Sequence, residues 1–461
     1  MSQLPHRHAS AADCVEPEGG KTQSTQSPRS GSWLAKFLTI WIGQQLSFAG
    51  SMVGRFALIW WLTTTTGSAV VLASSTLIAF APSILLGPFV GPLIDRWNRR
   101  WVLLVSDGFT AMLSLWLAYL FWSGSMEIWH VYVVVLGRAI GSSFHGTTLR
   151  ASTTLLVPRD QLGRVNGLNQ MISALLSIAG PALGALLLSI LPLHGIMMVD
   201  VATAACAILP LCILRIPQPG AEHIHAIRRK GYFSNLAEGV HFIRRWPGLI
   251  ALIVLTLVLK IALTPALSLV PLLVHEQLKK GAGGLGLFQS LLGIGAAAGG
   301  LLLSVWGGGR RRTAVLLIGL IGVGAGVLVV GTAPASMFLI ALCGAFVLGT
   351  SMSLVSASSS AVMQTSVPAQ LQGRVFTLVS SAVSLTTPIG LGLAGPVSEW
   401  LGVRAWFQAG GALCMAVGAL GFFIPALLRI ESGVPETDPP SSGKTEERSQ
   451  PRLPDQNRAR S

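Results

Sequence analysis

Long apolar runs are the feature that most constrains how this chain folds. Residues 74–90, 101–122, 165–190 and 314–330 are four of many such runs. About 18 apolar residues are enough for a helix to cross the hydrocarbon core of a bilayer. Only 11% of the side chains are charged, against about 25% in soluble domains. The sequence therefore predicts an all-α integral membrane protein, because so much apolar surface must face a solvent other than water.

Polar breaks between these runs divide the chain into twelve expected transmembrane helices. They cover roughly residues 34–62, 68–90, 101–122, 128–149, 164–189, 192–213, 248–274, 284–306, 313–331, 335–357, 374–397 and 402–428. Several of them contain glycine and proline. Membrane spans tolerate both residues, because neighbouring helices satisfy the backbone groups that are freed.

The expected helices fall into two groups of six, covering residues 33–213 and 248–430. The tails, residues 1–32 and 431–461, are polar and are predicted to be disordered, because they bury too little apolar surface to offset the entropy of folding. Residues 214–247 form a polar linker between the groups.

The linker contains one amphipathic pattern. Phe233, Leu236, Val240 and Ile243 recur at helical spacing and are followed by two arginines. This pattern predicts a short helix lying on the inner membrane surface, or a tether that only spaces the two groups.

Lysine and arginine are distributed unevenly over the loops. The loops on one side hold sixteen of them, and the loops on the other side hold only Lys279, Lys280 and Arg404. Basic loops stay on the cytoplasmic side of a membrane. We therefore expect a multi-pass protein of the cell (plasma or inner) membrane with both termini in the cytoplasm. The net charge of +14 then reflects topology, and nucleic acid is not an expected partner.

Two stretches of similar sequence indicate an internal repeat. "VPRDQLGRVNGL" starts at Val157 and "VPAQLQGRVFTL" starts at Val367, 210 residues later. Each begins an expected helix that contains an internal proline. Two parallel six-helix halves are the simplest interpretation, and such halves place a substrate path between them near the middle of the bilayer.

A charged loop between the second and third expected helices carries the first family resemblance. Residues 91–100, "GPLIDRWNRR", contain the pattern Gly91, Asp95, Arg96, Arg99 and Arg100. This pattern resembles the signature of the major facilitator superfamily at the same place, with Asn98 where glycine is usual. Farther along the chain, Gly180, Pro181 and Gly184 are similar to the glycine–proline motif of proton-coupled exporters in that superfamily.

The resemblance extends over nearly all of residues 33–430. Thr66-Gly67-Ser68 after the first helix and "EGVHFIRRWP" in the linker are similar to the subgroup that contains macrolide-efflux pumps and the enterobactin exporter. This resemblance implies twelve transmembrane helices in two pseudo-symmetric six-helix bundles, and it implies efflux.

The single carboxylate of the charged loop needs its own explanation. Asp95 is expected to cap a neighbouring helix or to pair with an arginine of a neighbouring loop. Such a latch would hold the cytoplasmic helix ends together while the outer side is open, and the resemblance implies the same role. The alternative, that the arginines only fix topology, leaves Asp95 unexplained, because acids contribute little to orientation.

Ionisable residues inside spans are costly and are functional candidates by default. The candidates are Arg55, Asp107, Arg138, His145, Asp200 and Lys260. Arg138 and Lys260 are expected to line a central cavity, because they lie too deep to reach the membrane surface easily. Burial favours the protonated form of a carboxyl group, so Asp200 is the proton-site candidate, with Arg138 or Arg55 as a nearby base. A structural pair is an equally good interpretation of Asp200.

The other candidates carry more ordinary interpretations. Asp107 is expected to form a structural ion pair, and His145 to be a satisfied polar residue rather than a proton relay. Gln44 and Gln45, together with Asn166, Asn169 and Gln170, either line the cavity or make hydrogen bonds between helices.

Several other classes of function are disfavoured. The glycine-rich run at residues 291–300 follows no strand and is not followed by the lysine of a phosphate loop, so ATP-driven transport is disfavoured. The five cysteines lack metal-ligand spacing, and no nucleophile triad stands out. We therefore expect no enzyme, no cofactor and no metal.

The expected function is a monomeric secondary transporter that exports amphipathic small molecules in exchange for protons. Three alternatives remain open. They are an exporter of an endogenous metabolite such as a siderophore, an uptake symporter, and a membrane sensor or scaffold that transports nothing.

Overall fold

The computed structural model describes residues 32–214, 218, 240–306 and 311–432. Over these residues the chain forms twelve long helices and no strand. Six precede the linker: α1 (Ser32–Thr66), α2 (Ala69–Ile94), α3 (Arg99–Ser123), α4 (Ile128–Leu156), α5 (Leu162–Ile190) and α6 (Leu193–Ile213). Six follow it: α9 (Pro247–Leu272), α10 (Ala282–Trp306), α11 (Arg312–Thr332), α12 (Phe338–Ser366), α13 (Ala369–Leu401) and α14 (Val403–Gly421). The predicted all-α fold class is confirmed.

Several helices extend past the ends expected from hydropathy. α4 ends at Leu156 and α12 at Ser366, each two residues before a proline that follows valine in the repeated Val-Pro sequence. Proline cannot continue a helical hydrogen-bond pattern and restricts the residue before it. The apolar run ends where the helix leaves the hydrocarbon, whereas the backbone stays helical up to the proline.

In the described part of the chain, eleven helices are long and apolar enough to span a membrane by length and composition. The twelfth long helix, α4, does not reach that hydropathy, because it carries Arg138, Arg150, two histidines and several hydroxyl side chains. Polar residues on a span of this length indicate a helix that faces protein or water rather than lipid.

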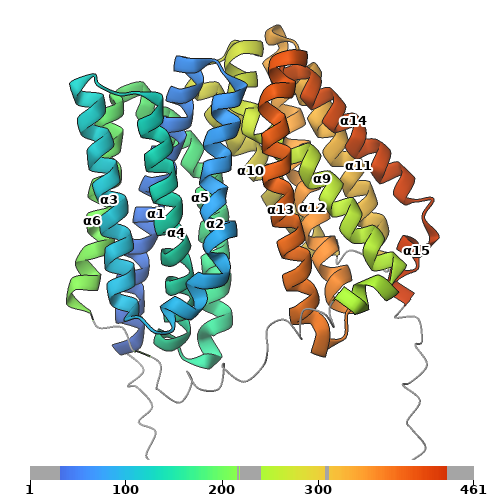
Figure 1. The fold of residues 1–461 in the computed structure, drawn as a ribbon, viewed down its shortest axis with the longest axis horizontal. Coiled ribbons are helices and arrows are strands. Elements are labelled where there is room, and N and C mark those ends of the chain that lie inside the picture. Colours follow the sequence, from blue (N-terminus) through green and yellow to red (C-terminus); the bar gives the residue numbers. More distant parts are fainter. Residues whose placement is uncertain (1–31, 215–217, 219–239, 307–310, 433–461) are drawn as a thin grey trace, which may run out of the picture.

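The helices form two bundles, α1–α6 and α9–α14, that stand side by side (Figure 1). In the first bundle α1 packs on α5 and α6, α2 packs on α4, and α3 packs on α4 and α6. The second bundle repeats the same pairs with α9 in place of α1 and so on: α9 packs on α13 and α14, α10 on α12, and α11 on α12 and α14. The repeat seen in the sequence is therefore a repeat of packing.

The C-terminus of α6 and the N-terminus of α9 lie at the same end of the two bundles (Figure 1). We call this end the linker end and the opposite one the far end. α1 begins at the linker end, and so do α3, α5, α11 and α13, whereas the even-numbered long helices run the other way.

Glycines allow the closest helix packing within each bundle. A Cβ on Gly295 or Gly299 of α10 would collide with the backbone oxygens of Phe346 and Thr350 on α12. The Thr350 hydroxyl uses this proximity to donate to the carbonyl of Gly295 at 3.0 Å. The glycine-rich run at residues 291–300 is thus a helix-packing face, as small residues in membrane helices commonly are.

The charged loop between α2 and α3 ties together helices of the first bundle. Arg99 donates from Nη1 to the carbonyl of Ala151 in α4 at 2.7 Å. Arg100 donates from Nε to the carbonyl of Leu211 in α6 at 2.6 Å, and from Nη2 to that of Cys212. These carbonyls lie near helix C-termini, where cations are favourable.

The linker and tail predictions fall largely outside the described residues. Phe233 and Leu236 are among the residues that are not described, as are both tails before residue 32 and after residue 432. Residues 240–245 are helical, and Trp246 is buried in the second bundle. After the last helices of the second bundle, Glu431 accepts hydrogen bonds from the backbone amide and the hydroxyl of Thr313 and so caps the start of α11.

Candidate functional site

The two bundles meet through the far halves of their helices. Gly286 of α10 packs on α5, where a Cβ would lie 2.7 Å from the Cβ of Ala185 and 2.9 Å from the oxygen of Pro181. On the opposite side of the interface, a Cβ on Gly395 of α13 would lie 2.8 Å from Val70 of α2. These two seams therefore allow no side chain larger than hydrogen at the contacting glycines.

Polar and aromatic contacts close the far end between the seams. The Ser68 hydroxyl, at the start of α2, donates to Oε1 of Glu399 on α13 at 3.3 Å. Trp60 of α1 packs edge to face against His275, 5.4 Å between ring centres, and His275 lies on the π-helix Leu273–Gln277 that continues α9. Short π-helices occur frequently at functional sites.

Toward the linker end the bundles diverge (Figure 1). The face of α5 that packs on α10 through Ile178 continues by helical spacing to Gly167 and Gly163, and the α13 face of Gly395 continues to Gly373. Among the residues that the structure describes, no packing neighbour lies within 4 Å of a Cβ built on any of these three glycines. The same helix faces are therefore packed in their far halves and open in their linker-end halves.

The glycine–proline motif of α5 lies at this contact. α5 remains helical through Pro181. Gly180 and Gly184 face α1, where a Cβ would lie 3.3 Å from Met52 Sδ and 2.8 Å from a ring carbon of Phe56. In the turn before the proline, the carbonyl of Ile178 accepts a hydrogen bond from the Ser290 hydroxyl of α10 at 2.7 Å. The glycines of the motif thus pack α5 on α1, and the turn before the proline joins α5 to α10 of the second bundle.

A first polar cluster surrounds Asp200 inside the first bundle. Arg138 of α4 lies with Nη2 at 2.8 Å from Oδ2 of Asp200, and the Asp200 side chain is only 2% exposed. Ser114 of α3 donates to Oδ2 at 2.8 Å, and Ser51 of α1 donates to Oδ1 at 3.0 Å. Gly54 of α1 provides the space, since a Cβ there would lie 3.5 Å from the same carboxylate. We call these residues the Asp200 cluster.

Arg55 extends this cluster. Its side chain is exposed to solvent, yet protein surrounds it and its charge interacts with those of Arg138 and Asp200. The predicted place of Arg55 on the substrate path stays a prediction. With one carboxylate and two guanidinium groups, the Asp200 cluster carries an excess positive charge.

A second polar cluster lies closer to the linker end. Gln44 of α1 donates from Nε2 to Oδ2 of Asp107 on α3 at 2.9 Å. His145 of α4 places Nε2 at 3.2 Å from Oδ1 of Asp107 and at 2.7 Å from Oε1 of Gln44. Gln44 and Asp107 are buried, and 24% of the His145 side chain is exposed. We call these three residues the Asp107 cluster.

Other predicted site residues lie apart from both clusters. Lys260 of α9 is exposed, and it takes part in none of the three ion pairs found among the described residues. Gln45 is half-buried, and Asn169 accepts a hydrogen bond from the indole of Trp41 at 2.6 Å, which ties α5 to α1. The predicted cavity role of Lys260 and Gln45 stays a prediction.

The predicted latch is not among the contacts of the described residues. Asp95 follows the last turn of α2, and its Oδ1 lies 3.9 Å from Nη2 of Arg99, the first residue of α3. Arg96 is exposed, and no packing neighbour from the described residues lies within 4 Å of a Cβ built on Gly91. A contact from Asp95 to a neighbouring loop remains a prediction for a conformation in which the linker ends are together.

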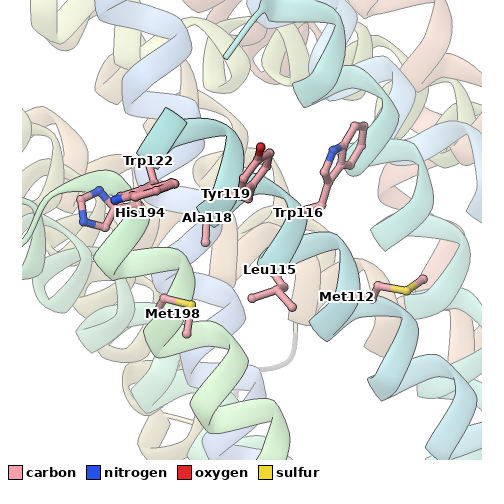
Figure 2. A pocket seen from close by; sticks show the side chains of 8 residues that line it. All are labelled: Met112, Leu115, Trp116, Ala118, Tyr119, Trp122, His194 and Met198. Atoms are coloured by element: carbon pink, nitrogen blue, oxygen red, sulfur yellow. The ribbon is translucent and has the colours of Figure 1, made fainter. Parts of the chain in front are cut away.

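A separate apolar groove lies on the outer surface of the first bundle. Figure 2 shows its lining, which includes Leu115, Tyr119 and Trp122 of α3 and His194 and Met198 of α6. α3 and α6 are the helices of this bundle on the side away from α9–α14 (Figure 1). Apolar and aromatic side chains at this position suit contact with lipid, so the groove is not our candidate site.

Sequence reasoning did not identify Ser51, Ser114 or Gly54, which complete the Asp200 cluster. Serine and glycine are common in membrane helices, and neither type by itself indicates a site. Spacing along the sequence is the signal that could have identified the two serines. Ser51 lies seven residues after Gln44, and Ser114 lies seven residues after Asp107, the same spacing that separates Arg138 and His145.

Comparisons of the sequence with a family profile and with known proteins agree with one another. The sequence profile of the Major Facilitator Superfamily matches residues 40–386 and 269–459. Macrolide efflux protein A of Streptococcus pyogenes is 31% identical over 388 residues, which cover 84% of this chain and 95% of that protein. Multidrug efflux pump Tap of Mycolicibacterium fortuitum is 25% identical over 389 residues, covering 83% of this chain and 94% of Tap.

Solved structures resemble this one at the level of the fold. A bacterial homologue of the iron transporter ferroportin, described as inward-facing, superposes with a TM-score of 0.65 at 14% identity. The match covers 84% of this chain and 98% of that one.

Proposed function

Because this chain belongs to the major facilitator superfamily, we propose that it is a secondary active transporter that exports amphipathic small molecules of the macrolide type in exchange for protons. The relatives named as macrolide and multidrug efflux pumps support export of such substrates. The observation that carries the proposal is the asymmetry between the two ends of the bundles, which pack at the far end and diverge at the linker end.

Alternating access follows from this asymmetry. A substrate enters between the linker ends, and a rocking motion of the bundles then packs the linker-end faces and separates the far-end seams. Glycines suit this motion in both bundles. Gly163 and Gly167 of α5 and Gly373 of α13 carry no side chain that would keep the linker-end faces from approaching each other closely. The contact of Asp95 with a neighbouring loop belongs to that second state.

The direction of transport rests on the orientation of the chain. The basic loops lie at the linker end, so we assign the linker end to the cytoplasm. The structure then corresponds to the state that takes up substrate from the cytoplasm.

Arg55 supports a second candidate, export of an anionic metabolite such as a siderophore. Its exposed guanidinium adds positive charge beside the Arg138–Asp200 pair. A cation on an internal surface favours an anionic ligand over a basic drug.

Drug accumulation in cells tests the proposal. Bacteria that lack their own pumps and express this chain are expected to accumulate severalfold less radiolabelled erythromycin than cells with an empty vector. A protonophore is expected to abolish the difference, because it removes the proton gradient that drives export.

An export that survives the protonophore but stops when ATP is depleted would contradict the proposal. The same assay with a labelled catecholate siderophore decides between the candidates. Export of the siderophore without export of the macrolide favours the second one.

A further inference from the structure

The Asp200 cluster is built to keep its charges. Arg138 is a permanent cation, and Arg55 is a second one nearby. Adding a proton to Asp200 would leave both without a counter-charge inside the membrane, which is costly. Both oxygens of the carboxylate also accept hydrogen bonds from serine hydroxyls. A proton that drives transport therefore needs another group to bind to.

The Asp107 cluster has the opposite character, because its basic partner is a histidine. Free histidine has a pKa of about 6.5, so it changes charge in the physiological range. With His145 protonated, the pair with Asp107 is neutral. With His145 neutral, N–H groups of His145 and Gln44 still face the Asp107 carboxylate, but no cation among the described ion pairs balances its charge.

The hydrogen-bond geometry assigns the protons of the histidine ring. The amide nitrogen of Gln44 donates to Asp107, so the Gln44 oxygen faces His145. Nε2 of His145 therefore faces two acceptors, and it must carry a hydrogen in either charge state. The exchangeable proton then belongs to Nδ1, the other nitrogen of the ring.

The two clusters are related by the geometry of the bundle. Gln44, Asp107 and His145 each lie seven residues from a member of the Asp200 cluster on the same helix: Ser51, Ser114 and Arg138. Seven residues are two helical turns, about 10 Å. The clusters are thus two levels of one polar face shared by α1, α3 and α4, and the Asp107 cluster is the level nearer the linker end.

We propose that Gln44, Asp107 and His145 form the proton-binding site that couples transport, while Asp200 stays ionised as the structural counter-charge of Arg138. The proposal deepens the function proposed above and rests on it for the coupling. In the step, Nδ1 of His145 takes a proton from a hydronium ion, whose O–H bond breaks as the N–H bond forms and which leaves as water, and the cluster changes its net charge from −1 to zero. No bond to the ring other than N–H forms or breaks. In this conformation the proton leaves toward the linker end.

The permanent cations on the helices that form this site do not pair with Asp107 among the described ion pairs. On α4, Arg150 is the nearest arginine toward the linker end, and it is exposed. On α1, Lys36 lies eight residues before Gln44, about 12 Å along the helix. On α3, Arg99 and Arg100 donate to carbonyls of α4 and α6. None of these permanent cations replaces the histidine as the partner of Asp107 among the described ion pairs.

The neighbouring helices of the bundle add few other charges. α2 contributes no charged residue within Ala69–Ile94. α5 contributes Arg164, which is exposed near its start at the linker end. α6 contributes His194, which lines the outer apolar groove, and Asp200, which is paired with Arg138. The charge of the Asp107 site therefore depends on His145.

Infrared difference spectroscopy of the full chain in lipid nanodiscs tests the proposal without any substrate. Lowering the pH from about 8 to about 5 should protonate an imidazole. His145→Gln should remove one imidazole signal, and Asp107→Asn should change that signal, because the carboxylate that faces the ring is lost. His194→Gln is the matched control, since His194 lies on the apolar groove and should not affect the His145 signal.

Erythromycin export by the same variants tests the coupling. His145→Gln and Asp107→Asn are expected to lose protonophore-sensitive export, and His194→Gln is expected to retain it. Unchanged infrared titration in His145→Gln would overturn the proposal even if the wild type exports by antiport. Conversely, wild-type export that a protonophore does not reduce would refute proton antiport. The spectra would still show whether His145 binds a proton.

Discussion

Asp200→Asn is expected to abolish export and to lower the stability of the protein by about 3–5 kcal/mol, the cost of leaving one partner of a buried ion pair alone. The substitution removes the counter-charge of Arg138, whose Nη2 lies 2.8 Å from the carboxylate. Arg55 makes the loss worse, because two guanidinium groups then repel each other with no anion between them. Thermal unfolding in detergent and erythromycin export measure the two effects.

The single substitution Arg138→Gln should cost less than Asp200→Asn. Arg55 still attracts Asp200 in that variant, and the serine hydroxyls still donate to the carboxylate. The double variant Arg138→Gln with Asp200→Asn should be more stable than Asp200→Asn alone, because no unpaired charge of this pair remains. Additive losses in the double variant would contradict the ion pair as the reason for the effect.

Gly395→Val is expected to stop transport by preventing closure of the far end. A Cβ at this position would lie 2.8 Å from Cγ2 and 2.9 Å from Cα of Val70, so α13 and α2 must separate to admit it. Overpacking of this kind costs about 1–3 kcal/mol. In a two-state transporter that cost falls on the far-end-closed state alone, which shifts the equilibrium by about fivefold to 150-fold. Export assays and thiol accessibility at the far end report the change.

Gly392→Val on the same helix is the matched control. In the described part of the chain, no packing neighbour lies within 4 Å of a Cβ built on Gly392, and valine has the same effect on helix formation at both positions. The control should therefore transport like the wild type. Equal activity of the Gly395 and Gly392 variants would show that the seam between α2 and α13 does not close during transport.

The spans and the two-fold repeat of this fold can be predicted from the sequence, because both depend on local hydropathy and on similarity within the chain. Helix ends were less predictable. α4 and α12 run past the apolar core of their spans until a repeated Val-Pro sequence separates them from the next helix, and hydropathy does not report that extension.

The candidate site shows where sequence reasoning stops. Charge inside a span identifies Asp200, Arg138 and Asp107 as residues that need partners. It does not identify the partners, because pairing depends on which helix faces meet. The serines of the Asp200 cluster are ordinary in sequence. His145 likewise has the interpretation of a satisfied polar residue until Gln44 and Asp107 are seen beside it.

In the proposed cycle, the two bundles lose packing contacts at one end as they gain them at the other. Distance measurements between pairs of electron-spin labels test this most directly. In a chain without its five native cysteines, spin labels at positions 91 and 373 report the linker end. Labels at Thr65 and Leu401, both exposed, report the far end.

We predict two populations at each end in lipid nanodiscs. Acidification should change the populations in opposite directions, so that one end closes as the other opens. A single unchanging distance at both ends, or movement in the same direction at both, would contradict alternating access in this protein.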